Sequence, residues 1–253
     1  ALNLVRSGNI IFEKGKPPIL PTNYKLINGY IIGPSVNLNN ADLKNMNLKN
    51  VDLSKANLKG ANLTNANLTN ANLTNANLLR ANLVNANLTN ANLTNANLLI
   101  ANLVNANLTN ANLTKANLYR ANLVNANLTK VNLKNTELRY ANLKGVKSGN
   151  TFFTIDEQPI LPTNYTIRSY YIMGPYVNLE NADLRNANLD NVNLSYANLK
   201  GVKSGNITLK KGRPPTLPTN YKLISGYIIG PSVNLDNADL KNMNLKNVDL
   251  SKA

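Results

Sequence analysis

The sequence predicts an all-β solenoid, a chain wound into stacked coils with four sides each. Two periodicities carry this prediction: a five-residue unit that repeats without interruption from Val36 to Gly145, and a longer repeat of twenty residues. A third observation is that hairpin-like segments interrupt the array. Self-similarity at a fixed period is typical of solenoids, whose coils bury a core only by stacking on their neighbours.

The five-residue unit has the form Ala-(Asn/Asp)-Leu-x-x, and its third position is Leu throughout, from Leu38 to Leu143. A helix would spread this Leu around its circumference, and a flat strand would turn it to opposite faces in successive units. The pattern fits a chain that turns a corner about once per unit, so that Ala and Leu both point inward. The expected core of the central array comprises Leu63, Leu68, Leu73, Leu78, Leu83, Leu88, Leu93, Leu98, Leu103, Leu108, Leu113, Leu118, Leu123 and Leu128, with Ala66, Ala86, Ala106 and Ala126.

The twenty-residue repeat predicts the number of sides. The fourth and fifth positions are mostly Thr-Asn, but their apolar departures recur every twenty residues. Twenty residues are four units, so we expect a four-sided coil in which residues twenty apart stack at the β spacing of about 4.8 Å. Duplication of a twenty-residue gene unit would leave the same trace, but the five-residue period independently requires corners.

The unit Ala61-Asn62-Leu63-Thr64-Asn65 and its many copies resemble the pentapeptide-repeat proteins. The resemblance covers residues 36–145, 177–201 and 233–253. It implies a right-handed quadrilateral β-helix, in which the central Leu and the residue two before it face inward. The handedness is implied by the resemblance alone.

A long module repeats along the chain: residues 148–201 align without gaps to residues 7–60, and residues 204–253 align to 7–56. Each copy opens with a lead-in, meaning the residues before its five-residue units. Asn28-Gly29 predicts a tight hairpin turn in the first lead-in; Ser169-Tyr170 at the same place weakens that prediction in the second. A lead-in either continues the solenoid as an irregular coil or separates two solenoids, and we favour the second arrangement.

The predicted segments follow from this module, and both termini fall inside a copy, as in an excerpt from a longer array. The segments are lead-in hairpins at residues 1–35, 148–176 and 204–232, a main β-helix at 36–147, a short repeat segment at 177–203 and a truncated one at 233–253. We expect the uncapped end coils to fray or to pair with another chain, because they present unpaired backbone groups.

The residue types exclude most chemistry. The chain has no His and no Cys, so it lacks an imidazole base, a thiolate and the usual zinc ligands. Acids are sparse, and Asp42, Asp52 and Asp183 occupy a repeat position otherwise held by Asn, which indicates a structural role. We expect no enzyme activity, no cofactor, no metal and no small-molecule substrate. No apolar run is long enough to span a membrane.

One surface departs from the monotony of the array. Apolar residues stand at outward positions of neighbouring coils and would stack on one another, exposing an area of the size at which patches often mean contact. We call these residues the apolar patch and expect them to bind a protein partner or a second copy; cover by a lead-in and drift in a duplicated unit are the alternatives. The apolar patch consists of Leu79, Val84, Leu99, Ile100, Val104, Tyr119 and Val124.

The net charge of +15 suggests a second function, binding of a polyanion or nucleic acid. It argues against a third, because the family resemblance includes acidic DNA mimics that bind DNA gyrase, and this chain has the opposite sign. Columns of Thr, such as Thr69, Thr89 and Thr109, also suggest an ice-binding surface, although each Thr is followed by Asn or Lys rather than paired across the strand. Thr equally suits any β surface.

The function predicted from the sequence is therefore a non-catalytic, modular scaffold whose role and compartment stay open. Asn-Leu-Thr triplets on adjacent coils would carry colliding glycans in a eukaryotic secretory pathway. We therefore expect a bacterial protein, either cytoplasmic or at the cell surface.

Overall fold

The computed structural model describes residues 7–11 and 16–253; residues 1–6 and 12–15 of the first predicted lead-in lie outside them. The chain divides into two compact units. Unit 1 comprises Ala1–Asn142 and Phe152–Pro162, and unit 2 comprises Leu143–Thr151 and Thr163–Ala253.

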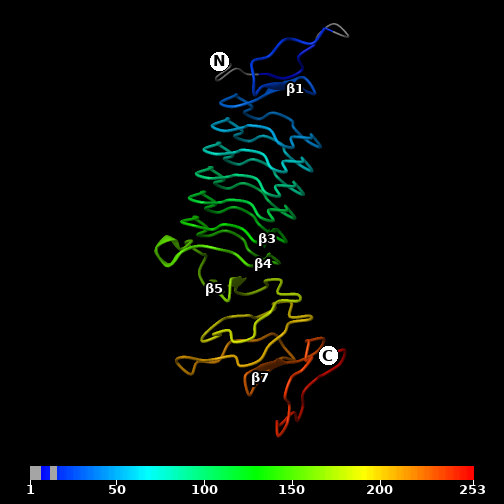
Figure 1. Ribbon diagram of the computed structural model, residues 1–253, viewed down its shortest axis with the longest axis vertical. Coiled ribbons are helices and arrows are strands. Elements are labelled where there is room, and N and C mark those ends of the chain that lie inside the picture. The colour runs from blue at the N-terminus through cyan, green and yellow to red at the C-terminus, as the bar shows by residue number, and fades with distance from the viewer. Residues whose placement is uncertain (1–6, 12–15) are drawn as a thin grey trace. The chain divides into compact units, whose positions relative to one another are not determined.

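In unit 1 the five-residue units form the predicted four-sided coil (Figure 1). Parallel bridges join second-position residues twenty apart, from Asn37 with Asn57 to Asn122 with Asn142. The backbone N–H of Leu63 donates to the carbonyl of Asn82 at 2.7 Å, and the N–H of Asn82 donates to Ala61 at 2.9 Å. The same ladder recurs on all four sides, so twenty residues make one coil.

The corners explain why Asn occupies two of the five positions. The fifth residue adopts a left-handed backbone, as at Asn65 with φ +57° and Asn90 with φ +58°, a conformation that Asn tolerates better than most residues. The second residue accepts a turn hydrogen bond: Asn87 Oδ1 accepts the N–H of Thr89 at 3.1 Å. Asn at these positions therefore stabilises the corner itself.

The core of the array is built from the first and third positions. Every Leu from Leu43 to Leu138 at the third position has no exposed surface, and Ala66, Ala86, Ala106 and Ala126 are at most 1 % exposed. The Leu side chains fill the coil, whereas Ala beside the corner leaves room for the chain to turn.

Each lead-in contains a short antiparallel hairpin. In unit 1, β1 (Lys25–Ile27) pairs with β2 (Tyr30–Ile32). In unit 2, two such hairpins occur. They are β5 (Thr166–Arg168) with β6 (Tyr171–Met173), and β7 (Lys222–Ile224) with β8 (Tyr227–Ile229). The remaining short elements are strand β3 (Asn127–Thr129) and the 3-10 turn η1 (Ile155–Glu157) in unit 1, and strand β4 (Lys147–Gly149) in unit 2.

The hairpin turns have both central residues left-handed, which is the type I′ pattern. Asn28 and Gly29 show φ of +45° and +79°. Ser169 and Tyr170 show φ of +47° and +65°, so the second lead-in keeps the tight turn that its sequence makes unfavourable. The N–H of Thr151, at 3.1 Å, and its hydroxyl, at 2.8 Å, both donate to the Tyr170 carbonyl, which helps hold this strained turn.

The third lead-in continues the stack of unit 2, and here the expectation of a break between solenoids is wrong. Thr208 forms a parallel bridge with Asn188, and Thr216 with Asn193. Asn188 and Thr208 are twenty residues apart, whereas Asn193 and Thr216 are further apart because the third lead-in has extra residues between its two bridges. The lead-in is therefore one enlarged coil, because its extra residues loop out while its flanking residues keep the ladder.

Ion pairs of reversed polarity tie two lead-ins to the coils before them. In unit 1, Lys134 Nζ lies 2.9 Å from Glu157 Oε2. In unit 2, the equivalent positions of the module hold Asp190 and Arg213, whose atoms lie 3.0 Å apart. The two copies thus keep the contact but exchange the charges.

Candidate functional site

The apolar patch lies on two consecutive corners of the unit 1 coil. Leu79, Leu99 and Tyr119 are fourth-position residues of one corner, and the three Val residues hold the same position of the next. Six of the seven side chains are partly buried, because each stacks on its neighbours one coil away. Ile100 is the exception, with 43 % of its surface exposed.

Ile100 combines exposure with an unfavourable backbone. It occupies a fifth position and has φ +58°. A β-branched residue in this region is a conformational outlier, since its Cβ crowds the following carbonyl, at a cost of about 1–2 kcal/mol. Arg80, Arg120 and Tyr140 hold the same position in neighbouring coils, with φ of +57° to +60°.

An aromatic and cationic cluster ends the patch, and the sequence reasoning missed it. The ring centroids of Tyr119 and Tyr140 lie 5.2 Å apart in an edge-to-face arrangement. The Arg120 guanidinium lies 5.4 Å from the first centroid and 5.9 Å from the second, within cation–π range. Tyr140 is 68 % exposed. Extending the twenty-residue column by one coil would have found it.

Glu137 and Arg139 form a bidentate ion pair beside this cluster. Arg139 Nη2 lies 2.7 Å from Glu137 Oε2, and its Nε lies 3.0 Å from both carboxylate oxygens. The Arg139 side chain donates to Glu137 and holds the pKa of that carboxyl below its usual value, although burial opposes the shift. The carboxylate also accepts the N–H of Arg139, as Asn does elsewhere in this position.

The Thr columns have their hydroxyl groups engaged within their own corners. Thr69, Thr89 and Thr109 each donate from Oγ1 to the Asn Oδ1 two residues earlier, at 2.6 Å. Each of these Thr residues therefore contributes to the corner it occupies.

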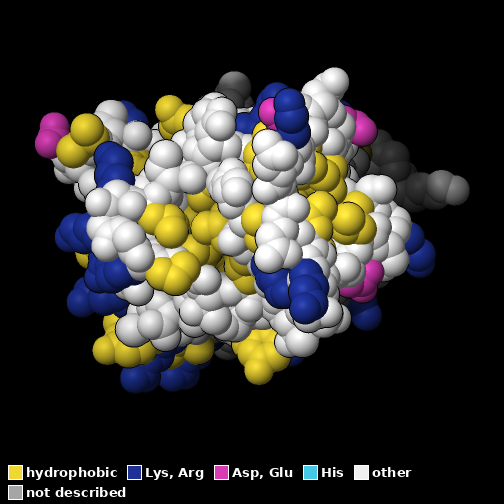
Figure 2. All heavy atoms as spheres, turned by 90° about the horizontal axis from the view of Figure 1, so that it is seen from below, with side chains coloured by type: hydrophobic (Ala, Val, Ile, Leu, Met, Phe, Trp, Pro, Cys, Tyr) yellow, Lys and Arg dark blue, Asp and Glu magenta, His cyan; other side chains and the backbone are white. Residues whose placement is uncertain are grey.

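Basic side chains are widely distributed, and Figure 2 shows one face of the molecule on which Lys and Arg are plentiful and Asp and Glu few. Within the described part of the chain, no group of three or more acidic, His or Cys residues is placed to hold a metal ion. Among the same residues, no helix has the length and apolar character needed to cross a membrane.

A left-handed corner every five residues, parallel bridges between residues twenty apart and an inward Leu in each unit define a class of protein: the quadrilateral β-helix. The sequence profile of the pentapeptide repeats matches the chain in eight copies, at residues 35–65, 66–98, 101–129, 116–147, 176–203 and 232–253. These matches cover more than half of the chain. The chain belongs to the pentapeptide-repeat family, whose β-helix is right-handed.

Several solved structures are similar to the chain. A pentapeptide repeat protein from the Arabidopsis thaliana thylakoid lumen is 28 % identical, with a TM-score of 0.31, over 46 % of this chain and 70 % of that one. HetL from the cyanobacterium Nostoc, involved in heterocyst differentiation regulation, is 27 % identical, with a TM-score of 0.30, over 71 % and 86 %. A form of QnrB1, a plasmid-mediated fluoroquinolone resistance protein, is 17 % identical, with a TM-score of 0.36, over 70 % and 82 %. These scores are too low to bear on function, and no curated protein matches.

Proposed function

We propose that the protein is a non-catalytic scaffold that binds another protein through the apolar patch. The partner surface would carry an apolar strip bordered by acidic side chains. The absence of His and Cys from the chain supports a non-catalytic role, because these residues supply the commonest general base and the thiolate nucleophile. Glu137, which lies beside the cluster at the end of the patch, is held by an ion pair and a backbone N–H rather than left available as a base.

The observation that carries the proposal is Ile100. Asn fills most fifth positions of the array at little conformational cost, so the fold does not require Ile here. Strain that the fold does not need tends to be retained where it serves a contact. At Ile100 the strained backbone presents a 43 % exposed apolar side chain in the middle of the patch.

Charge favours a different protein over a second copy. Arg80 and Arg120 border the apolar residues, and no Asp or Glu occurs between residues 61 and 135. Two copies meeting through this surface would bring like charges together, whereas an acidic border would be attracted and steered. Arg is also enriched in the energetically dominant parts of protein interfaces.

A photo-crosslinking amino acid placed at Val104 tests the proposal, with Thr109 as the matched control on the next corner of the same coil. In extracts of the source organism, we expect an adduct with an acidic protein from position 104 and not from position 109. Ile100→Asn should abolish the adduct while making the chain more stable, so unfolding cannot explain the loss. Adducts with the chain itself, equal adducts from both positions or no adduct at all would each overturn the proposal.

A further inference from the structure

We propose that a cavity in unit 2 binds a doubly charged oxyanion, namely a phosphate or sulfate group. The cavity has a volume of about 410 Å³ and involves no residue of the apolar patch. It is thus independent of the protein contact proposed above. Its lining residues all belong to unit 2.

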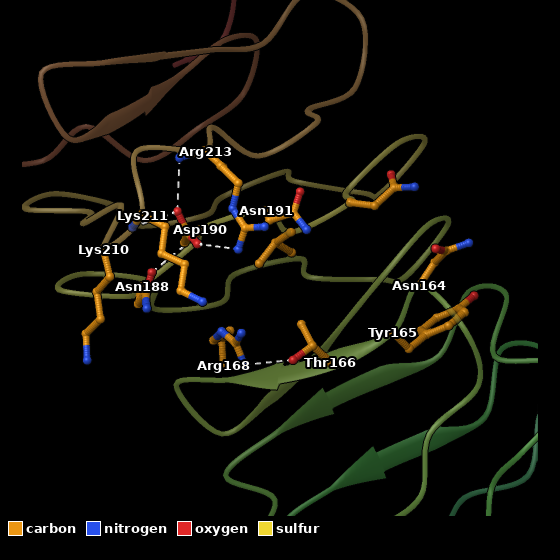
Figure 3. Close-up of a pocket in the computed structure, with 12 residues that line it drawn as sticks. Asn164, Tyr165, Thr166, Arg168, Asn188, Asp190, Asn191, Lys210, Lys211 and Arg213 are labelled. Carbon is orange, nitrogen blue, oxygen red and sulfur yellow. Dashed lines mark hydrogen bonds and ion pairs between the residues drawn. The ribbon is translucent and has the colours of Figure 1, made fainter.

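Two elements form opposite walls of the cavity, and Figure 3 shows their side chains. Thr166 and Arg168 come from β5, in the hairpin of the second lead-in. Lys210, Lys211 and Arg213 come from the enlarged coil of the third lead-in. The walls meet because that coil stacks on residues 188–193, as the bridge from Thr208 to Asn188 shows.

The charge of the cavity is positive. Asp190 is its sole carboxylate, against the four cationic side chains of Arg168, Lys210, Lys211 and Arg213. Asp190 is already satisfied, since its oxygens accept the backbone N–H of Lys211 at 3.1 Å, that of Arg213 at 3.0 Å and the Arg213 guanidinium at 3.0 Å. Burial tends to raise the pKa of Asp190, but the donors on Arg213 and Lys211 hold that pKa below its usual value. The carboxylate therefore neutralises one cation, and the other three remain for a ligand.

Arg168 supplies an independent indication of a ligand. Its Nη1 donates to Thr166 Oγ1 at 2.7 Å and to the Ile167 carbonyl at 3.0 Å, which fixes the guanidinium plane. Its Nε is buried and has no hydrogen-bond partner among the described residues. A buried donor without a partner is destabilising, and more so when it is charged.

The other copies of the module show that the fold does not need this arginine. The equivalent hairpin position holds Ile27 in the first lead-in and Ile224 in the third. Ile therefore fits this place in the hairpin without an orphaned donor. Arg at this position alone, facing Lys210 and Lys211, is accounted for if an anion completes its hydrogen bonds.

The donor set suits an oxyanion. An arginine with fixed orientation presents planar N–H groups that match phosphate or sulfate oxygens, and lysines add point charges. The cavity is several times larger than one phosphate, so the group can belong to a longer molecule. Free phosphate and a phosphorylated or sulfated polymer share this chemistry.

The experiment is a titration of the whole chain with inorganic phosphate at constant ionic strength, followed by the NMR signal of the Arg168 Nε–H. Chloride replaces phosphate in the reference titration. We expect a saturable downfield shift as the orphaned donor gains an acceptor. In Arg168→Ile, which lacks that signal, the backbone amide signals of Lys210 and Lys211 report binding, and phosphate affinity should fall about ten-fold or more, the size expected for losing a charge-assisted hydrogen bond.

The control is Lys241→Ala, which removes an equal charge outside the cavity and should leave phosphate affinity unchanged. Arg168→Ile should unfold at the same temperature as the parent or a higher one, since Ile occupies this place in both other copies. Repeating the titration with polyphosphate and with heparin distinguishes a free anion from a polymer. An Nε signal that responds equally to chloride, or equal phosphate affinity in Arg168→Ile and Lys241→Ala, would show that the cavity is not an anion site.

Discussion

Two corners of the same coil differ in their outward side chains and share nearly everything else. The threonine corner, Thr89-Asn90, and the patch corner, Leu99-Ile100, have the same fifth-position φ of +58°. In both, the Asn two residues before the fourth position accepts its N–H, at 3.1 Å for Thr89 and 3.2 Å for Leu99. The backbone therefore does not dictate the outward residues, and Leu-Ile in place of Thr-Asn needs a reason other than folding.

The largest expected effect is the difference in stability loss between substitutions at two adjacent residues, one inside the coil and one outside it. Leu98 has no exposed surface, whereas its neighbour Leu99 faces outward and is partly exposed. Leu98→Ala should lower the free energy of unfolding by about 3 kcal/mol, because it leaves a cavity in the core. Leu99→Ala should cost less than about 1 kcal/mol. Urea unfolding of both variants measures the difference, and equal losses would mean that Leu99 belongs to the core.

The next largest change in stability is expected when the fifth residues of the two corners are exchanged. Ile100→Asn should raise stability by about 1 kcal/mol, because Asn adopts the left-handed conformation with less strain. The reciprocal change, Asn90→Ile, should lower it by about 1–2 kcal/mol, since it introduces the strain and removes the bond from Asn90 Nδ2 to Asn70 Oδ1 at 3.0 Å. Thermal unfolding of the two single variants tests this. Destabilisation by Ile100→Asn would instead show that the Ile side chain packs favourably enough to offset its backbone.

The smallest effect concerns pH and the ion pair of Glu137 with Arg139, beside the aromatic cluster that ends the apolar patch. The pKa of Glu137 is lower in the folded chain than in the unfolded chain, mainly because Arg139 donates to it. Its contribution is therefore present above the unfolded pKa and is lost as the pH falls through the folded pKa. Solvent screening keeps it below about 1 kcal/mol. Between pH 7 and pH 3, the parent should lose slightly more stability than Glu137→Gln; parallel curves would contradict the assignment.

The regular array was predictable from the sequence to the level of single residues, because each unit repeats the same pattern of inward Ala and Leu followed by a corner. The left-handed φ at the fifth position was not, although the prevalence of Asn there is its signal. The cluster of Tyr119, Arg120 and Tyr140 could have been predicted by following the twenty-residue repeat one coil further, from Arg120 to Tyr140. The cavity around Arg168 was out of reach, since it joins residues from two lead-ins that are distant in the sequence.

The sequence alone determined the coil, because Ala and Leu at a five-residue period can be buried together only if the chain turns a corner in each unit. It also restricted the chemistry by omitting His and Cys. Tertiary structure decided how the lead-ins behave. An inserted segment can stack or separate, and the choice depends on long-range bridges such as Thr216 with Asn193 and on the ion pair of Asp190 with Arg213. Neither contact has a local signal, since each joins residues more than twenty positions apart.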